Sequence, residues 1–214
     1  MKIAQAKICG LTTSGQVATA LNAGADYVGF MSFPPSPRHI EPKDARPLAV
    51  QASERAKTVS VLVDPSDALL TCVLDDLLPD YIQLHGSEPP EFCAALRARG
   101  VGVIKAFGIA TATDLDQIPS YIGAIDMVLL DAKPPAEATR PGGLGHPFDW
   151  TILQAFDPAV PWFLSGGLTA NNVALGVHVS GAKLVDVSSG VETIRGLKDD
   201  ALMMAFMAAL NTDT

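Results

Sequence analysis

Short apolar segments and segments with helical spacing alternate along the whole chain. The apolar segments are typical of buried strands, and the segments between them repeat Ala, Leu, Val and charged residues with the period of a helix. Eight strands are predicted, at Ile3–Cys9, Tyr27–Phe30, Thr58–Val63, Tyr81–Leu84, Gly102–Ala106, Met127–Leu130, Trp162–Leu164 and Leu184–Val187. Helices are predicted around residues 13–23, 43–54, 66–78, 89–99, 112–120, 149–156, 170–178 and 198–210.

Each predicted strand is followed by a predicted helix, which is typical of a parallel sheet covered by helices. Eight such units in 214 residues, with no linker between them, favour a closed (β/α)8 barrel that forms one domain over residues 1–214. An open, doubly wound sheet has the same periodicity and is the alternative. In both folds the active site lies at the carboxyl ends of the strands, so the residues that follow each strand are the candidates for chemistry.

Composition excludes several classes of function. The net charge of −8 is spread without a block of like charge, so no nucleic-acid surface is expected, and an anionic substrate would need a local positive pocket. No signal peptide and no apolar run of about 20 residues is found, which predicts a cytoplasmic protein without a membrane segment. Three cysteines without a C-x-x-C pair indicate neither a disulfide framework nor a zinc site.

The first strand ends in a candidate base. Its two-residue side-chain period places Lys7 and Cys9 on the face toward the barrel and Ile8 on the face toward the helices. A thiol acts as a base only when it is deprotonated, and we expect Lys7 to lower the pKa of Cys9. The alternative is a buried structural cysteine, which is the interpretation that we give to Cys72 and Cys93 within predicted helices.

Two further strands end in candidate binding groups. The loop after the second strand contains three prolines before Arg38, which restrict its backbone and place the guanidinium at the mouth of the barrel. A guanidinium binds a carboxylate or phosphate through two parallel hydrogen bonds, although a solvated surface arginine is the alternative. His85 follows the fourth strand and either contacts substrate or lines the barrel as a hydrogen-bonded side chain.

The sixth strand is apolar until a carboxylate appears at its end, at Asp131. Burial raises the pKa of an unpaired acid, which suits a general acid. A helix-capping aspartate is the alternative, but the residues Ala-Lys-Pro-Pro that follow do not begin a helix. Residues 132–147 are rich in Pro and Gly and include Gly143, and we expect them to act as a mobile cover over the site.

The seventh and eighth strands end in loops suited to a phosphate. Gly166 and Gly167 follow the seventh strand, and Asp186 and Ser188 lie at the end of the eighth. Glycines before a helix let backbone N–H groups converge on an anion, and these two loops commonly hold a phosphate in barrels of this type. Together with Lys7 and Arg38 they would make the local positive pocket that an anionic substrate needs.

Nine sequence blocks carry a family resemblance over nearly the whole chain. In order they are KICGLT, GADYVGF, SPRHI, YIQLHG, VIKAF, VLLDAK, RPGGLGHPFDW, LSGGLTANNV and VDVSSGVE. By their order and spacing the chain resembles the phosphoribosylanthranilate isomerase family, which performs an Amadori rearrangement in tryptophan biosynthesis. The departures are mild: Met31-Ser32-Phe33 after the second block, Leu144 where Thr is common, and Ser165 before the glycine pair.

The resemblance implies a role for each candidate. Cys9 would be the general base, Asp131 the general acid and Arg38 the partner of the anthranilate carboxylate. The phosphate would be held by glycines of the sixth and seventh loops with a serine of the eighth, namely Gly143, Gly166, Gly167 and Ser188. Lys7, His85 and Asp186 are further substrate-binding candidates. The implied substrate is a phosphorylated aminosugar, and no metal, nucleotide or flavin is required.

Two other interpretations share some of these features. A different phosphate-binding barrel enzyme, such as a thiamin-phosphate synthase or an aldose–ketose isomerase of histidine biosynthesis, would share the seventh and eighth loops. A non-catalytic phosphometabolite-binding barrel would not need a thiol facing a carboxylate. The first strand, with Lys-x-Cys-Gly at its end, favours the isomerase. Both a monomer and a homodimer are compatible with the sequence.

Overall fold

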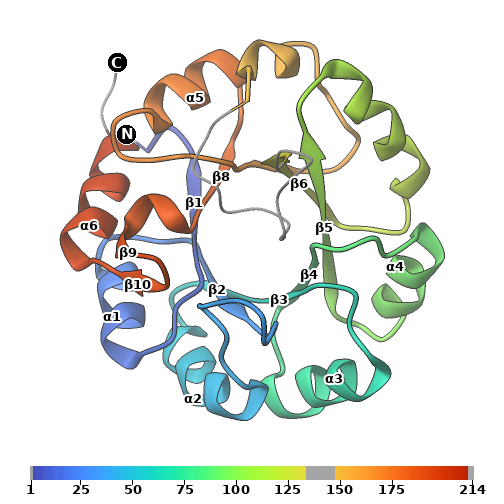
Figure 1. Cartoon of the computed structure of the whole chain (residues 1–214), viewed down its shortest axis with the longest axis vertical. Coiled ribbons are helices and arrows are strands. Elements are labelled where there is room, and N and C mark those ends of the chain that lie inside the picture. The colour runs from blue at the N-terminus through green and yellow to red at the C-terminus, as the bar shows by residue number, and fades with distance from the viewer. Residues whose placement is uncertain (1, 134–147, 212–214) are drawn as a thin grey trace.

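The strands of the chain close into a single parallel barrel (Figure 1). The computed structural model describes residues 2–133 and 148–211. Its barrel strands are β1 Gln5–Cys9, β2 Tyr27–Met31, β3 Lys57–Leu62, β4 Tyr81–Leu84, β5 Gly102–Ile109, β6 Met127–Ala132, β7 Trp162–Leu164 and β8 Leu184–Val187. Because β1 pairs with both β2 and β8, the barrel prediction is confirmed and the open sheet is excluded.

Helices surround the barrel in the order that the sequence predicts (Figure 1). They are α1 Ser14–Asn22, α2 Pro42–Ala52, α3 Asp67–Cys72 with a π-helical turn at Val73–Leu77, α4 Pro90–Arg97, α5 Val173–Ser180 and α6 Asp200–Ala209. Side-chain caps begin several of them; for example, Asp199 accepts a hydrogen bond from Leu202 N at 2.9 Å. No helix in the described parts of the chain combines the length and apolar character of a membrane span.

Two segments predicted as helices are 3-10 helices instead, at Ala112–Tyr121 and Trp150–Leu153. Pro119 lies within the first of these segments, and a proline inside an α-helix removes a hydrogen bond and clashes with the preceding turn. The second ends at Leu153, before the predicted end at residue 156. In the first segment local proline chemistry therefore outweighs the helical spacing of the apolar residues.

Side chains of the strands alternate between two hydrophobic clusters. Ile8, Val28 and Val128 belong to the larger cluster between the barrel and the helices. The smaller cluster fills the barrel and comprises Cys9, Tyr27, Val59, Val61, Ile104, Ala106, Leu129, Phe163 and Leu184. The predicted faces of the first strand are thus confirmed, with Cys9 inside and Ile8 outside.

Aspartates stabilise the amino end of the barrel by a repeated contact. Asp26, Asp80 and Asp126 each directly precede an even-numbered strand, and each accepts a hydrogen bond from a backbone N–H of the preceding odd-numbered strand. The donors are Ala6 at 2.7 Å, Thr58 at 2.8 Å and Val103 at 2.8 Å. Each aspartate also pairs with a cation, respectively Lys2, Lys57 and Arg97. These contacts satisfy backbone groups at the strand ends.

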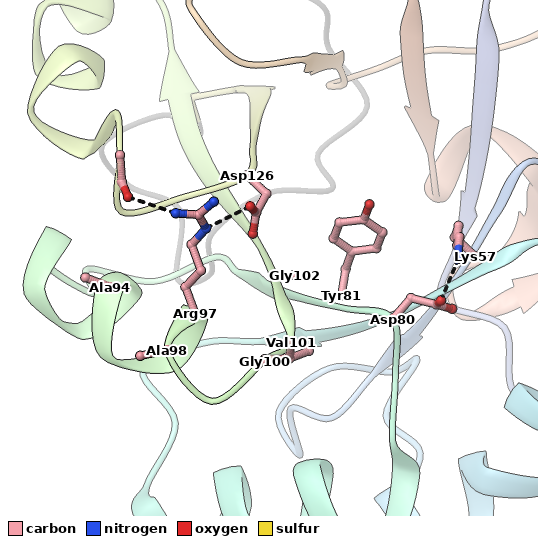
Figure 2. A pocket seen from close by; sticks show the side chains of 11 residues that line it. Lys57, Asp80, Tyr81, Ala94, Arg97, Ala98, Gly100, Val101, Gly102 and Asp126 are labelled. Atoms are coloured by element: carbon pink, nitrogen blue, oxygen red, sulfur yellow. Dashed lines mark hydrogen bonds and ion pairs between the residues drawn. The ribbon is translucent and has the colours of Figure 1, made fainter.

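A pocket lies at this same amino end, among the starts of β3 to β6. Figure 2 shows the Lys57–Asp80 pair on one side of it and the Arg97–Asp126 pair on the other. The ion pairs span 2.9 Å and 2.8 Å, so the charged side chains that line the pocket are paired with each other. Because Cys9 and Asp131 lie at the opposite end of their strands, this pocket belongs to the stabilising face of the barrel.

We predict that Asp80→Ala lowers the free energy of unfolding by about 1–2 kcal/mol at neutral pH, because Thr58 loses the partner of its N–H and hydroxyl groups. Partial burial acts to raise the pKa of Asp80, but hydrogen bonds from Thr58 and the Lys57 ammonium lower it below its ordinary value. A lowered pKa in the folded state stabilises the protein above the unfolded pKa of about 3.9. This stabilisation is lost as the pH falls through the folded value.

Urea unfolding at neutral and at acid pH would measure this effect. The free energy of unfolding of Asp80→Ala should be lower than that of the parent protein by the whole predicted amount at neutral pH. This difference should become smaller at acid pH. Asp116→Ala, at an exposed position in a surface 3-10 helix, is the control and should change stability little. A difference that does not change with pH would contradict the predicted role of the ionised carboxylate.

Candidate active site

The predicted acid and base both lie at the carboxyl end of the barrel. Cys9 is the last residue of β1, and Asp131 is the last but one of β6. Both are buried, with 4% and 7% of their surfaces exposed. In the closed barrel β7 and β8 stand between β6 and β1, so the loops after β7 and β8 lie between the two residues. The barrel thus places the predicted phosphate loops between the predicted acid and the predicted base.

Cys9 occupies a space that its neighbouring strand leaves open. Gly29 on β2 is its partner in register, and a Cβ atom at Gly29 would lie 2.9 Å from the Cys9 Sγ atom. Burial raises the pKa of the Cys9 thiol above its ordinary value, although the cations of Lys7, Lys198 and Arg38 act to lower it. Lys7 thus acts to lower the pKa of Cys9 as expected, but the net shift is upward, because desolvation outweighs the attraction of the nearby charges.

Lys7 lies inside the barrel, where its side chain is fully buried. Its Nζ atom donates a hydrogen bond to Gln83 Oε1 and lies 3.4 Å from Asp186 Oδ1. The other oxygen of Asp186 accepts a hydrogen bond from the Ser165 hydroxyl at 3.1 Å. Lys7 is therefore paired with Asp186, which reduces its contribution to the local positive pocket that the sequence predicts.

His85 connects this buried group to the predicted acid. Its Nδ1 atom lies 3.0 Å from Gln83 Nε2, and its Nε2 atom lies 3.3 Å from Asp131 Oδ2. The other oxygen of Asp131 accepts a hydrogen bond from the Ala132 backbone N–H at 2.9 Å. Both of the roles that the sequence leaves open for His85 remain compatible with this position, since 18% of its side chain is exposed.

Arg38 belongs to a buried cluster of three charged side chains, Arg38, Glu192 and Lys198. Arg38 makes two hydrogen bonds of 2.7 Å to the two oxygens of Glu192, from Nε and Nη2, and Lys198 lies 2.6 Å from Glu192 Oε1. Burial acts to raise the pKa of Glu192, but the two cations hold it at about 2. With Arg38 and Lys198 both protonated the cluster carries one net positive charge next to Cys9, although burial lowers the pKa of Lys198 below its ordinary value.

Lys198 also connects the cluster to the first strand. Its ammonium donates to the backbone oxygen of Ser188 at 2.9 Å and to the Ser188 hydroxyl at 3.2 Å. That hydroxyl in turn donates to the backbone oxygen of Cys9 at 3.1 Å. A continuous series of polar contacts thus joins the loop after β8, which is predicted to hold phosphate, to the residue that is predicted to act as the base.

Glycines allow the loops after β7 and β8 to approach each other and the end of β6 closely. Gly166 and Gly167 have φ values of +85° and +67°, which side chains rarely permit. A Cβ atom at Gly166 would lie 2.3 Å from the Ala132 nitrogen. One at Gly190 would lie 1.8 Å from the Leu168 oxygen. The backbone is therefore packed directly against backbone where these loops meet.

Two predictions concern residues that lie outside the described part of the chain. Gly143, the proposed contribution of the sixth loop to the phosphate site, is one of them. The other is the proposed covering segment, residues 132–147, of which only Ala132 and Lys133 belong to the described residues. Both stay predictions.

Comparisons with known proteins agree on one family. The family model described as N-(5'phosphoribosyl)anthranilate (PRA) isomerase matches residues 6–209. The isomerase of Rhodopseudomonas palustris strain HaA2 is 50% identical over 204 residues, 95% of this chain and 94% of that protein. The isomerase of Rhizobium meliloti strain 1021 is 48% identical and covers 96% of both chains. The chain belongs to the phosphoribosylanthranilate isomerase family.

Solved structures of this isomerase family have the same fold. The crystal structure of the Thermotoga maritima isomerase matches with a TM-score of 0.87 and 34% identity, covering 97% of this chain and 98% of that one. A second matching structure, with a TM-score of 0.84, 32% identity and the same coverage, is a complex with reduced 1-(o-carboxyphenylamino)-1-deoxyribulose 5-phosphate. The family resemblance and the fold predicted from the sequence are both confirmed.

Three polar residues of this site, Gln83, Glu192 and Lys198, have no role predicted from the sequence. Glu192 lies in the matching block VDVSSGVE and Gln83 in YIQLHG, so the blocks contained both residues without indicating their partners. Lys198 lies on the hairpin of β9 Glu192–Ile194 and β10 Leu197–Lys198, a pair of strands that the sequence pattern does not predict. Along the chain this hairpin lies between β8 and α6, and in the view of Figure 1 it lies at the left of the barrel, near α1 and α6.

We predict that Lys198→Met raises the pKa of Cys9, because it removes one of the cations that oppose the effect of burial. Among the residues that the structure describes, the remaining charged neighbours of Cys9 are Lys7, Asp186 and Arg38. The titration of the Cys9 Cβ resonance, in protein labelled on cysteine, should move to higher pH. Lys57→Met, which removes a lysine at the opposite end of the barrel, is the matched control and should leave it unchanged. An unchanged or lower midpoint in Lys198→Met would contradict the prediction.

Proposed function

We propose that this protein is a phosphoribosylanthranilate isomerase, which converts N-(5'-phosphoribosyl)anthranilate to 1-(2-carboxyphenylamino)-1-deoxyribulose 5-phosphate in tryptophan biosynthesis. The observation that carries the proposal is the position of a thiol and a carboxylate at the ends of β1 and β6 in a chain of this family. The reaction is an aldose–ketose isomerisation, which requires one general acid and one general base.

Asp131 is the proposed acid. It gives its proton to the furanose ring oxygen as the bond between that oxygen and C1' breaks, and the anilino nitrogen, which keeps its hydrogen, supplies the electron pair that forms an iminium ion. The carboxylate that remains has the Ala132 N–H at 2.9 Å on one oxygen and His85 at 3.3 Å from the other. Hydrogen bonds to the charged form of a carboxylate stabilise it, so these neighbours favour the transfer of the proton.

Cys9 is the proposed base. As a thiolate it removes the proton from C2' of the iminium ion. The C2'–H electron pair forms the double bond of an enolamine while the C=N pair returns to nitrogen, and the enolamine then tautomerises to the ketose. Burial makes the thiolate scarce, but it also makes the thiolate a strong base where it forms. Lys7 and the net positive cluster of Arg38, Glu192 and Lys198 compensate part of the cost of this buried negative charge.

The proposed binding groups flank the acid and the base. The phosphate is assigned to backbone N–H groups of the loops after β7 and β8, around Gly166, Gly167 and Ser188. The anthranilate carboxylate is assigned to Arg38, whose bonds to Glu192 use Nε and Nη2. Within the described residues no hydrogen bond reaches Arg38 Nη1, so this nitrogen has donors for a second carboxylate.

The proposed reaction has one partner, a small phosphorylated aminosugar, and every residue named for it comes from one chain. A monomer and a homodimer would therefore contain the same groups. Because the substrate is a phosphorylated intermediate of amino-acid biosynthesis, we propose that the protein acts in the cytoplasm.

We predict that Cys9→Ala and Asp131→Asn each lower kcat by about 10²–10⁴-fold, as expected for the loss of a positioned acid or base. Phosphoribosylanthranilate would be generated in the assay, and turnover would be followed as the loss of its fluorescence. Cys72→Ala and Asp116→Asn are the controls, because both residues are exposed. Near-normal turnover in either folded variant would remove that residue from the mechanism, and no turnover by the parent protein would exclude the proposed function.

We also predict that Arg38→Met raises KM by roughly 10- to 100-fold with a smaller effect on kcat, because a hydrogen bond to a charged group contributes about 1.5–3 kcal/mol. Steady-state kinetics with the same substrate would measure both constants. Arg55→Met on the exposed surface is the control. An unchanged KM would count against the carboxylate role of Arg38.

A further inference from the structure

A series of hydrogen-bonding groups crosses the carboxyl end of the barrel from Lys7 to Asp131. Lys7 on β1 contacts Gln83 Oε1 on β4, Gln83 Nε2 lies 3.0 Å from His85 Nδ1, and His85 Nε2 lies 3.3 Å from Asp131 Oδ2 on β6. Lys7, Gln83 and Asp131 have 0%, 1% and 7% of their surfaces exposed. Water therefore has little access to the first contact of the series, so the protein groups themselves decide which atoms donate and which accept.

Lys7 decides the orientation of the Gln83 amide. An ammonium group has three donors and no acceptor, so it requires an oxygen as its partner. The opposite orientation of the amide would direct the Gln83 NH2 group at the Lys7 ammonium, two donors facing each other in a buried place. The Gln83 oxygen must therefore face Lys7. It follows that the Gln83 NH2 group faces His85 Nδ1.

The orientation of Gln83 in turn decides where His85 carries its hydrogen. A neutral imidazole has one N–H donor and one acceptor nitrogen, and a protonated imidazole has two donors. Since Gln83 directs an N–H at Nδ1 from 3.0 Å, Nδ1 must be the acceptor. The hydrogen then resides on Nε2, the nitrogen 3.3 Å from Asp131.

We propose that Gln83, anchored by Lys7, is a positioning residue that holds His85 as the neutral tautomer with its hydrogen on Nε2, directed at Asp131. The tautomer of His85 does not depend on the proposed function. Only its effect on catalysis does, because that effect requires Asp131 to be the acid. In that role the carboxylate that forms on proton transfer has a donor beside each oxygen: the Ala132 N–H at 2.9 Å and the His85 Nε2–H at 3.3 Å. The opposite tautomer would direct a lone pair at that negative charge.

The first experiment determines the tautomer in the parent protein. Proton–nitrogen NMR spectra of protein labelled on the histidine ring distinguish a protonated from an unprotonated ring nitrogen, and His85→Asn identifies the resonances of His85. At neutral pH we expect Nε2 protonated and Nδ1 unprotonated. A hydrogen on Nδ1, on both nitrogens or shared between them would overturn the proposal. This result does not depend on turnover, so it is separate from a failure of the proposed function.

The second experiment reverses the polarity of Gln83. In Gln83→Glu a carboxylate would accept from both Lys7 and His85, so we expect the hydrogen of His85 to move to Nδ1. We expect kcat to fall by about 10- to 100-fold with little change in KM, because the lost donor acts on the anion that forms in the reaction. Gln51→Glu on the exposed surface of α2 is the matched control and should change neither the tautomer nor kcat.

The outcomes of the second experiment separate a positioning role from a structural one. An unmoved tautomer or an unchanged kcat in folded Gln83→Glu would overturn the proposal. If that variant does not fold, Gln83→Met replaces it and removes the donor without adding charge. A mixture of the two tautomers with a lower kcat would then support the proposal, and a hydrogen that stays wholly on Nε2 would overturn it.

Discussion

The carboxyl end of this barrel depends on the pairing of one buried charge, the ammonium of Lys7. A charge out of water is costly unless it is paired and hydrogen-bonded, and Lys7 is fully buried. It is satisfied by Asp186 at 3.4 Å and by the side-chain oxygen of Gln83. Through Asp186 it orders Ser165 at the end of β7, and through Gln83 it orders His85 beside Asp131. One buried cation thus connects the neighbourhood of the proposed base to that of the proposed acid.

The base is subject to two opposed effects. Burial raises the pKa of Cys9, and the cations around it lower the pKa without cancelling the effect of burial. The cluster of Arg38, Glu192 and Lys198 contributes one net positive charge to this balance, and the hairpin that carries Glu192 and Lys198 is packed against the loop of Arg38. The same cluster thus acts on the pKa of Cys9 and orients the Arg38 guanidinium, which is the proposed binding group. The β9–β10 hairpin contributes to both effects.

The two ends of the barrel have different kinds of contacts. At the amino end, Asp26, Asp80 and Asp126 repeat one contact with the backbone of the preceding strand, and their charges are paired nearby. At the carboxyl end, polar side chains from β1, β4, β6 and β8 converge with His85 and Ser165, and backbone is packed against backbone at Gly166 and Gly190. Stability is concentrated where strands begin, so the loops where they end are available for binding and chemistry.

The sequence by itself determined the eight strands, the face of β1 that carries Cys9, the acid and base candidates at strand ends, and the family. These follow from local periodicity and from short motifs. Only the tertiary structure showed that Arg38 binds Glu192, which is 154 positions further along the chain. It also showed that Gln83 contacts both Lys7 and His85. It also decided the direction of the pKa shift of Cys9, because burial depends on the whole barrel whereas the sequence shows only the neighbouring lysine. Side-chain partners and desolvation are set by residues distant in sequence, which a pattern along the chain does not contain.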